Sequence, residues 1–302
     1  MKELRVLKGI TRLENASALD QSVDGLREVV HRVIQPQSVR DVLHGVPVGH
    51  PVHPLAVLVP AGAWVSSAVL DVMPGTAQAS RVLVAFGVIS AIPAALAGYT
   101  DWSELHRQQA RVGLVHAAGN VAAIALYTAS YIQRRRGREF SGKVLGYLGL
   151  ACISGSGYLG GHLAYRQASG ANHAEQVPHR FPAGWQRLAE LDTIPEHQLT
   201  TMEVAGQPLL VLRRGQSVDV LSNVCTHLAG PLASGELIDG ETDNPCVACP
   251  WHGSVFELRT GEVVHGPATA PQHRFESRVV EGVVEVRLPN AVESEYPVAA
   301  TV

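Results

Sequence analysis

The chain has 302 residues, a formal net charge of −3 and a calculated isoelectric point near 6.5. This length suggests about two domains, and the near-neutral charge argues against nucleic acid as a partner. The 4 cysteines are too few and too unevenly spread for a disulfide scaffold. The mean hydropathy of +0.09 conceals an asymmetry, because residues 54–161 are almost uncharged over long runs while the remainder is typical of a soluble protein.

Residues 1–45 form an amphipathic N-terminal segment. Apolar residues recur at three- and four-residue spacing from Leu19 to Val33, and Pro36 interrupts the pattern, which predicts one or two short amphipathic helices over residues 14–45. Charged residues interrupt the segment throughout, so we do not expect a secretory signal peptide. Such an apolar stripe packs on its own protein or lies along a membrane surface.

Four apolar stretches follow, each about 18–21 residues long and so sufficient to cross a hydrocarbon core of about 30 Å as a helix. They are Pro54–Met73, Val82–Tyr99, Val112–Ile132 and Val144–Gly161. The alternative is a buried helical bundle of a soluble protein. Soluble helices keep a charged outer face, which these stretches lack until their ends. We therefore predict a four-helix transmembrane domain over residues 46–166.

The composition changes after Tyr165. Residues 167–184 are polar and contain Pro and Gly, as expected of a linker, and residues 185–288 show short β-rich runs separated by turns. Residues 289–302 are expected to be a loose tail. The predicted fold class is thus α+β multi-domain, a four-helix transmembrane bundle followed by a small all-β domain.

A two-part metal site is predicted within the β-rich region. Cys225 and His227 form a C-x-H pair. After 21 intervening residues, Cys249 and His252 form a C-x-x-H pair. Zinc accepts such a mixed set of ligands, although the spacing is not that of a zinc finger. The alternative is a [2Fe–2S] cluster with both cysteines on one iron and both histidines on the other.

The residues around these pairs resemble the Rieske family. The resemblance rests on CTHLAGPL (225–232), CPWHGSVFELRTGEVV (249–264) and GPATAPQ (266–272), the last of which is similar to the Pro-containing loop that covers the cluster in that family. It spans about residues 185–288 and implies a [2Fe–2S] cluster bound by the four ligands above.

The resemblance also indicates a branch of the family. Gly230 and Trp251 stand where respiratory Rieske proteins have two disulfide-bonded cysteines, so the ferredoxin-like branch is expected. Ser254 is expected to donate a hydrogen bond to a cluster sulfur, and Phe256 replaces the tyrosine donor of the respiratory branch. We therefore predict a reduction potential between those of the two branches. Cys246 is expected to be a loop thiol and not a ligand.

The apolar half resembles the DUF2231 family of bacterial membrane proteins of unknown function. The resemblance rests on VGHPVHPLAVLVPAGAWVSSAVLDV (47–71), AGYTDW (97–102), GLVHAAGN (113–120) and YLGGHLAYR (158–166). It covers about residues 40–170 and implies no activity.

Four histidines are expected at one face of this domain, namely His50, His53, His116 and His162. Intramembrane ionisable residues are costly and usually functional, so these side chains are candidates for binding a b-type haem or a quinone. The alternative is that they end helices at the membrane interface, which applies most to His50 and His162. His116 and Asn120 lie one helical turn apart and should point together.

The expected orientation is ambiguous from charge alone. Arg134, Arg135, Arg136, Arg138 and Lys143 crowd the loop between the third and fourth apolar stretches, which favours a cytoplasmic position for that loop. Arginines near the opposite face almost balance this count. Because a Rieske cluster is assembled in the cytoplasm, we expect a multi-pass protein of the cell membrane with a cytoplasmic Rieske domain.

The functional expectation is one-electron transfer with a quinone, a haem or a redox protein at the membrane face. We expect no catalytic residues of the chain's own, because only about 14 residues follow Leu288 and a Rieske oxygenase needs a second, iron-binding domain. The alternatives are electron supply to a separate oxygenase or reductase, and a membrane-anchored redox or iron sensor. Membrane lipid and a second copy of the chain, as a homo-oligomer, are further expected partners.

Overall fold

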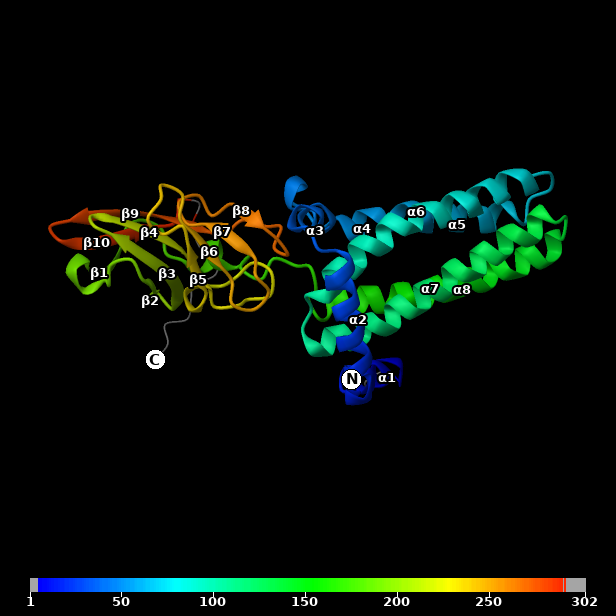
Figure 1. Ribbon diagram of the computed structural model, residues 1–302, viewed down its shortest axis with the longest axis horizontal. Coiled ribbons are helices and arrows are strands. Elements are labelled where there is room, and N and C mark those ends of the chain that lie inside the picture. Colours follow the sequence, from blue (N-terminus) through cyan, green and yellow to red (C-terminus); the bar gives the residue numbers. More distant parts are fainter. Residues whose placement is uncertain (1–4, 290, 292–302) are drawn as a thin grey trace. The chain divides into compact units, whose positions relative to one another are not determined.

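The structure of the chain is a computed structural model in which residues 5–289 and residue 291 are described (Figure 1). It divides into two compact units, one made of Met1–His44 with Pro51–Gly170 and the other of Gly45–His50 with Ala171–Val302. The expected tail over residues 289–302 therefore lies almost entirely outside the described residues.

The N-terminal segment contains three α-helices, α1 (Arg5–Glu14), α2 (Asp20–Val33) and α3 (Gln37–His44). The last two lie within residues 14–45, for which the sequence predicted one or two helices. The apolar stripe of α2 packs on its own unit, because Val23 and Val30 are buried there. Ion pairs tie the segment to the four long helices that follow it. In one of them, Arg111 binds both carboxylate oxygens of Asp20 at 2.7 and 2.8 Å.

The four long apolar segments are helical. The first is divided into α4 (Val52–Ala56) and α5 (Leu58–Leu70), and the others are α6 (Ala77–Ser103), α7 (Arg107–Arg135) and α8 (Glu139–Tyr165). Prolines interrupt the first segment, since Pro54 and Pro60 lack the N–H that a continuous helix would bond. All four are long and apolar enough to cross a membrane by length and composition.

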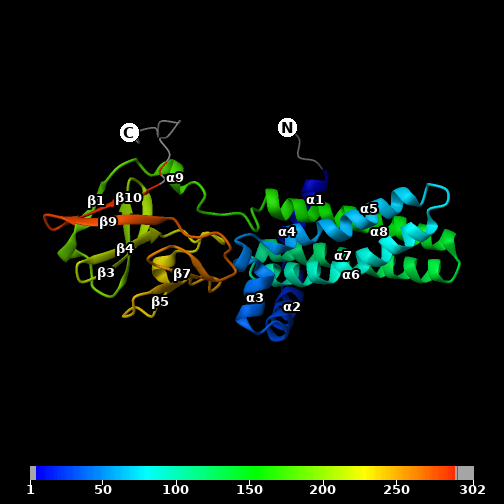
Figure 2. The same ribbon diagram turned by 90° about the horizontal axis from the view of Figure 1, so that it is seen from above.

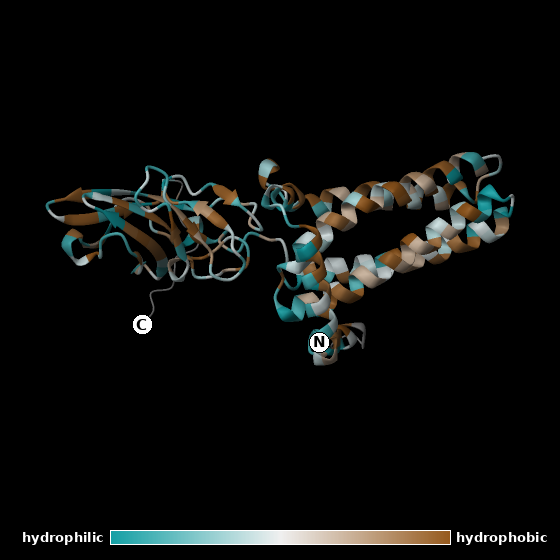
Figure 3. Cartoon of the chain, in the orientation of Figure 1, coloured by the Kyte–Doolittle hydropathy of each residue, from teal (hydrophilic) through white to brown (hydrophobic). Residues whose placement is uncertain are grey.

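Figure 3 shows hydrophobic to near-neutral residues along most of the length of these helices, with strongly hydrophilic ones mainly toward their ends. At most 28% of the most apolar 18-residue window in each helix is buried inside the protein. Leu58, Val82 and Ile89 are each more than half exposed. A helix in water would cover such a face or replace it with charge, so this pattern is that of helices solvated by lipid.

The helices pack as two hairpins, α5 against α6 and α7 against α8 (Figures 1 and 2). Trp64 and Tyr127 join the hairpins by stacking face to face, with ring centroids 4.2 Å apart and planes 5° apart. Arg134 is buried and forms a two-point ion pair with Asp71. Arg134 therefore lies in α7 and not in the loop where the sequence placed it, and its charge is neutralised inside the bundle.

The second unit is a β-structure whose named strands pair antiparallel in the described residues. A six-stranded sheet has the order β1-β10-β9-β4-β3-β2, and a four-stranded sheet has the order β5-β6-β7-β8. Their bounds are β1 (Gln186–Glu190), β2 (Leu199–Val204), β3 (Gln207–Arg214), β4 (Ser217–Ser222), β5 (Glu236–Ile238), β6 (Cys246–Ala248), β7 (Val255–Glu257), β8 (Val263–His265), β9 (Arg274–Val280) and β10 (Val283–Arg287).

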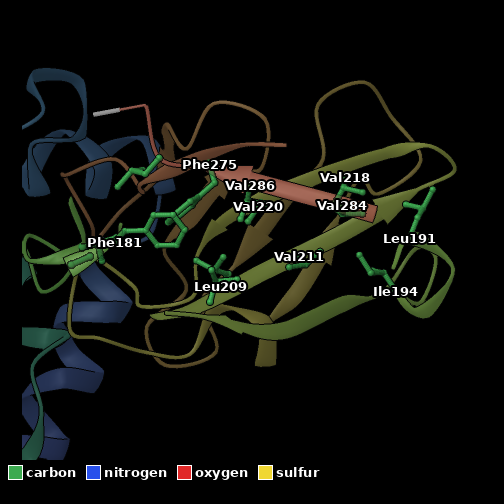
Figure 4. Close-up of a cluster of buried hydrophobic side chains, with 14 residues drawn as sticks. Phe181, Leu191, Ile194, Leu209, Val211, Val218, Val220, Phe275, Val284 and Val286 are labelled. Atoms are coloured by element: carbon green, nitrogen blue, oxygen red, sulfur yellow. The ribbon is translucent and has the colours of Figure 1, made fainter. Parts of the chain in front are cut away.

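Two hydrophobic cores lie on opposite faces of β3. Leu209 and Val211 point into the core shown in Figure 4, whereas Leu210 and Leu212 point into a second core that includes Cys225 and Cys249. This alternation follows from the two-residue period of a strand. The second core supports the loops that carry the predicted metal ligands.

Residues 174–181 differ from the linker expected there. They include the short helix α9 (Val177–Arg180), and Ala174, Val177 and Phe181 are buried in the first core. Phe181 contacts Phe275 edge to face with centroids 4.8 Å apart (Figure 4). These three apolar residues recur at three- and four-residue spacing, so the segment is part of the β-unit despite its polar composition.

Candidate metal centre

The first predicted ligand pair lies on the loop that follows β4. This loop is closed by hydrogen bonds from the Cys225 N–H to the Gly230 carbonyl (2.9 Å) and from the Ala229 N–H to the Cys225 carbonyl (2.9 Å). Ala229 has φ of 61°, a left-handed conformation that completes the tight turn. The loop buries Cys225 and leaves His227 partly exposed.

The second ligand pair lies on the tight turn between β6 and β7. The Cys249 N–H donates to the Ser254 carbonyl at 2.8 Å, and the Gly253 N–H donates to the Cys249 carbonyl at 3.1 Å. Gly253 has φ of 72°, which a side chain would strain. Cys249 is buried and His252 is partly exposed, as in the first loop.

A third loop, residues 266–272, is bonded to both ligand loops. The Thr226 hydroxyl donates to the Ala270 carbonyl at 2.8 Å, and the Gln272 side chain donates to the Val224 carbonyl at 2.9 Å. The Ala268 N–H donates to Ser254 Oγ at 3.0 Å. These bonds hold all three loops as one unit, so the positions of the ligands are fixed before anything binds.

The two cysteines form a thiol–thiolate pair. The Cys225 thiol donates a hydrogen bond to the Cys249 sulfur, and this bond, with the Trp251 and His252 N–H groups, lowers the pKa of Cys249 to about 6. The pKa of Cys225 is raised, because ionising this thiol would remove the hydrogen bond that it donates to Cys249, and because it is buried beside a thiolate. Two facing sulfurs that share one proton are suited to a metal ion, which displaces such protons on binding.

The two histidines form a second pair. The His227 and His252 rings lie with centroids 5.0 Å apart at an interplanar angle of 90°. Cys225 and Cys249 are only 1% and 5% exposed, whereas both imidazoles reach the surface. The site therefore has a closed sulfur side and an open nitrogen side.

This arrangement fits a two-iron cluster better than a single zinc ion. Within residues 5–289 and residue 291, no three His, Cys, Asp or Glu side chains are grouped so that they could hold one metal ion. The four donors instead form one sulfur pair and one nitrogen pair, which is the division that a Rieske [2Fe–2S] cluster requires.

Gly230 and Trp251 meet directly beside the cysteine pair. A Cβ on Gly230 would lie 2.8 Å from Cys249 Sγ and 3.2 Å from the Trp251 ring. The indole thus occupies the space beside the sulfur, and it is half exposed. Neither residue is a cysteine, so no disulfide joins the two ligand loops here.

Ser254 is buried behind the cysteines. Its Oγ accepts the Ala268 N–H, so the serine retains its own hydroxyl proton for donation. Cys246 lies on β6, is partly buried and faces Asp239 and Glu257, and burial is the first cause that raises the pKa of its thiol. Its position separates it from the two ligand pairs.

The structure brings together two of the four membrane histidines. His53 on α4 and His116 on α7 lie edge to face, with ring centroids 6.5 Å apart and planes at 89°. His162 instead binds Glu14 on α1 at 2.7 Å, and His50 is exposed in a turn before α4. His116 Nε2 lies 3.0 Å from the Asn120 amide, in agreement with their predicted common direction.

A polar cluster that the sequence did not predict surrounds Arg134. Arg134 also contacts Ser80 at 3.1 Å and Ser130 at 3.1 Å, and the Ser80 hydroxyl donates to Asp71 at 2.6 Å. A lone Asp at the end of one apolar stretch and an Arg at the end of another were the available signal. Such a pair is costly in lipid unless its members meet.

Comparisons with known proteins match both units. A family model described as Rieske [2Fe-2S] domain matches residues 184–283, and one described as predicted membrane protein (DUF2231) matches residues 49–173. The anthranilate 1,2-dioxygenase ferredoxin subunit of Burkholderia cepacia is 34% identical over 107 residues, which are 35% of this chain and 94% of that protein. Ferredoxin CarAc of Metapseudomonas resinovorans is 36% identical over 83 residues, which are 28% of this chain and 73% of that protein.

A solved structure also matches the β-unit. The ferredoxin of carbazole 1,9a-dioxygenase from Nocardioides aromaticivorans IC177 is 28% identical with a TM-score of 0.32, and the match covers 35% of this chain and 98% of that one. By its match to the Rieske family model and to the Burkholderia cepacia ferredoxin subunit, the C-terminal unit is a ferredoxin-like electron carrier, for which the family implies a [2Fe–2S] cluster. The chain belongs to the Rieske [2Fe–2S] family and carries a DUF2231 domain ahead of its Rieske domain.

Proposed function

We propose that this chain is a membrane-bound one-electron carrier whose cluster is held by Cys225 and Cys249 on one iron and by His227 and His252 on the other. The observation that carries this assignment is the separation of a buried sulfur pair from a partly exposed imidazole pair, on two loops braced by a third. The bound cluster supplies a single exchangeable electron.

The chain's own residues determine where that electron enters and leaves. The buried cysteines exclude water from the sulfur side, and the Trp251 and His252 N–H groups stabilise negative charge on Cys249. The Ser254 hydroxyl stabilises the more negative reduced state by donating to a sulfur. His227 and His252 form the exposed side, and an electron partner docks there.

We further propose that the four long helices anchor this carrier in the cell membrane. Their lipid-type outer faces support this, as does the match to a family described as predicted membrane proteins. Asp71 neutralises the charge of Arg134, so Arg134 no longer counts among the positive charges that would hold the loop between α7 and α8 in the cytoplasm. This leaves the Rieske domain on the cytoplasmic side, where the cluster is assembled.

The partner is a quinone, a haem or a redox protein at that face. A second candidate, electron supply to a separate oxygenase, is favoured by the two ferredoxins above, since the name of one assigns it to a dioxygenase. The two candidates differ in what oxidises the reduced cluster.

A stopped-flow experiment on the full-length protein in lipid nanodiscs distinguishes them. The cluster is reduced, and its reoxidation is followed optically after addition of a water-soluble quinone analogue or of a purified Rieske oxygenase. Rapid reoxidation by the quinone supports the membrane carrier, and reoxidation by the oxygenase alone supports the second candidate. Absence of a Rieske EPR signal from iron-replete protein would refute both.

A further inference from the structure

The membrane domain is an internal repeat of one helical hairpin. Asp71 and Arg134, which bind each other, are 63 positions apart in the chain. His53 and His116, whose rings lie edge to face, are also 63 positions apart, and so are the stacked rings of Trp64 and Tyr127. Three successive contacts therefore join positions that are equivalent in two copies of the hairpin.

The second helices of the two hairpins repeat in the same way, but their equivalent positions are separated by one residue fewer than those of the first helices. Gly87 and Gly149 make room for Trp64 and Tyr127 respectively, because a Cβ on either glycine would overlap the neighbouring ring.

Gly98 makes room for the His53 ring, and Gly160 makes room for the His116 ring. A Cβ would lie 2.7 Å from the first imidazole and 3.0 Å from the second.

The change in spacing falls in the turn of each hairpin. Gly75 and Gly137 occupy these turns with φ of 80° and 73°. In the helices before the turns, His53 is equivalent to His116. In the helices after the turns, Gly98 is equivalent to Gly160. Contacts between equivalent positions occur where a twofold axis passes between them. The bundle therefore has an internal pseudo-twofold axis, and the two histidines lie on either side of it.

Each histidine is held in the same way on its own hairpin. His53 Nδ1 lies 2.9 Å from the Ala94 carbonyl, and His116 Nδ1 lies 2.7 Å from the Ser156 carbonyl. A carbonyl only accepts, so each Nδ1 carries the proton and each Nε2 keeps its lone pair. A backbone carbonyl bonded to Nδ1 is the usual support of a histidine that binds a metal through Nε2.

The separation of the rings suits one metal ion between them. An imidazole bound at about 2.0–2.1 Å has its centre roughly 3.2 Å from the metal, so two on opposite sides have centres about 6.4 Å apart. The observed separation is 6.5 Å. A quinol hydrogen-bonded at both ends would need its two acceptor nitrogens about 11 Å apart, which this pair does not provide.

Two imidazoles are too few ligands for a bare ion. Among the described residues no third His, Cys, Asp or Glu joins them in a group that could hold a metal. Haem iron needs only two axial ligands from the protein, because the porphyrin supplies the other four. We propose that His53 and His116 are the two axial ligands of one b-type haem bound at the pseudo-twofold axis of the membrane domain.

Asn120 marks the one departure from symmetry at this site. Its amide lies 3.0 Å from His116 Nε2 and donates to it, whereas the equivalent position in the first copy is Val57. The amide keeps that nitrogen unprotonated, which is the form that binds iron. For His116 Nε2 to bind haem iron, this hydrogen bond would have to be exchanged for the metal.

The site is tested on full-length protein produced with a supply of haem precursor and purified in detergent. We expect a Soret band, the sharp visible bands of a reduced six-coordinate haem, and haem and protein in equal amounts by pyridine haemochrome assay. His53→Ala and His116→Ala should each lower the haem content about tenfold or more. His50→Ala, three positions from His53 and exposed, should retain it.

A conservative variant separates ligation from a structural role. His53→Met keeps an axial ligand, so the haem should remain and its reduction potential should rise. Loss of haem from this variant together with loss of the fold, seen as aggregation on gel filtration, would show a structural role and overturn the assignment. Protein that binds only a bare metal ion, or shows no haem absorbance, would overturn it too.

The role of this haem as the cluster's electron partner rests on the proposed function, but the haem site does not. A full Rieske EPR signal in haem-free protein would refute the haem and leave the cluster assignment intact. A bound haem without a Rieske signal would do the reverse.

Discussion

Asp71 and Arg134 form a two-point ion pair in the described bundle, with Nη1–Oδ1 at 2.7 Å and Nη2–Oδ2 at 2.6 Å. Their side chains are 3% and 0% exposed. Removing one member leaves a buried charge without a counter-ion, which typically costs about 3–5 kcal/mol. We therefore expect Asp71→Asn to lower thermal stability in detergent strongly, while Arg135→Ala, at an exposed neighbour, changes it little.

The internal repeat makes a sharper form of this prediction. Positions 71 and 134 are equivalent in the two hairpins, so the exchanged pair Asp71→Arg with Arg134→Asp should recover much of the stability that either single change removes. Thermal unfolding of both single variants and the double variant gives the coupling between the two positions. Additive losses in the double variant would contradict the equivalence.

The two cysteines on the second cluster loop provide a matched test of the ligand assignment. Cys249→Ala removes one sulfur of the buried pair, and we expect loss of the cluster's visible absorbance, its EPR signal and its iron. Cys246→Ala, three positions earlier, should retain all three, because that thiol lies apart from the ligand pairs. Iron content with EPR checks both, and an intact cluster in the Cys249 variant would contradict the assignment.

The parts of the fold that could be predicted are those marked by a pattern of residues close together in the sequence. The four membrane helices follow from uninterrupted apolar runs, and the cluster loops follow from four ligands at a specific spacing. The sequence located strands β3, β4, β8, β9 and β10 and missed β1, β2, β5, β6 and β7, whose residues are less continuously apolar. The burial of Phe181 was missed for a different reason, since a polar composition concealed three apolar residues at helical spacing.

The internal repeat shows what single-sequence reasoning overlooks. His53, Gly87 and Gly98 each recur as the same residue type in the second copy, but most intervening positions differ. The copies also change spacing at the turn, which hides them from a search at one fixed period. Arg134 was misread likewise, because counting loop charges gives no sign of a partner far away in the chain.

The glycines that face aromatic rings differ in a testable way from those that face lipid. A Cβ at Gly149 would lie 2.8 Å from the Tyr127 ring, whereas a Cβ at Gly155 meets nothing within 4 Å. Overpacking of this kind costs about 1–3 kcal/mol. Gly149→Ala should therefore lower the unfolding temperature in detergent, and Gly155→Ala should leave it unchanged or slightly raised. Equal effects would show that the stack tolerates the extra methyl group.

We propose that the Ser254 hydroxyl raises the reduction potential of the cluster by donating a hydrogen bond to a sulfur. Its hydroxyl proton is available because Oγ already accepts the Ala268 N–H. Ser254→Ala removes a donor that favours the reduced state, so the potential should fall by on the order of 50 mV, the equivalent of about one hydrogen bond. Protein-film voltammetry measures the shift, with the exposed Ser234→Ala as control. An unchanged potential would show that the hydroxyl does not reach a sulfur.

His273 gives the Rieske domain a pH-dependent stability. Its Nε2 donates to the Ala174 carbonyl at 2.9 Å, and burial lowers the pKa of the ring, although this bond and Glu175 act in the opposite direction. Below about pH 6.5 the unfolded chain takes up a proton at this histidine that the folded domain does not. The free energy of unfolding therefore decreases as the pH is lowered from about 6.5 to the lowered pKa of the folded state. The decrease is at most about 1.4 kcal/mol per pH unit.

Unfolding at pH 7.5 and pH 5.5 checks this contribution. Replacement by a neutral side chain in His273→Gln should reduce the loss of stability between the two values, because the titrating ring is gone. His179→Gln, at an exposed position on α9, is the control and should keep the full loss. Cluster titration affects all three proteins alike, so the difference between them isolates His273. Equal losses in the two variants would assign the pH dependence to other groups.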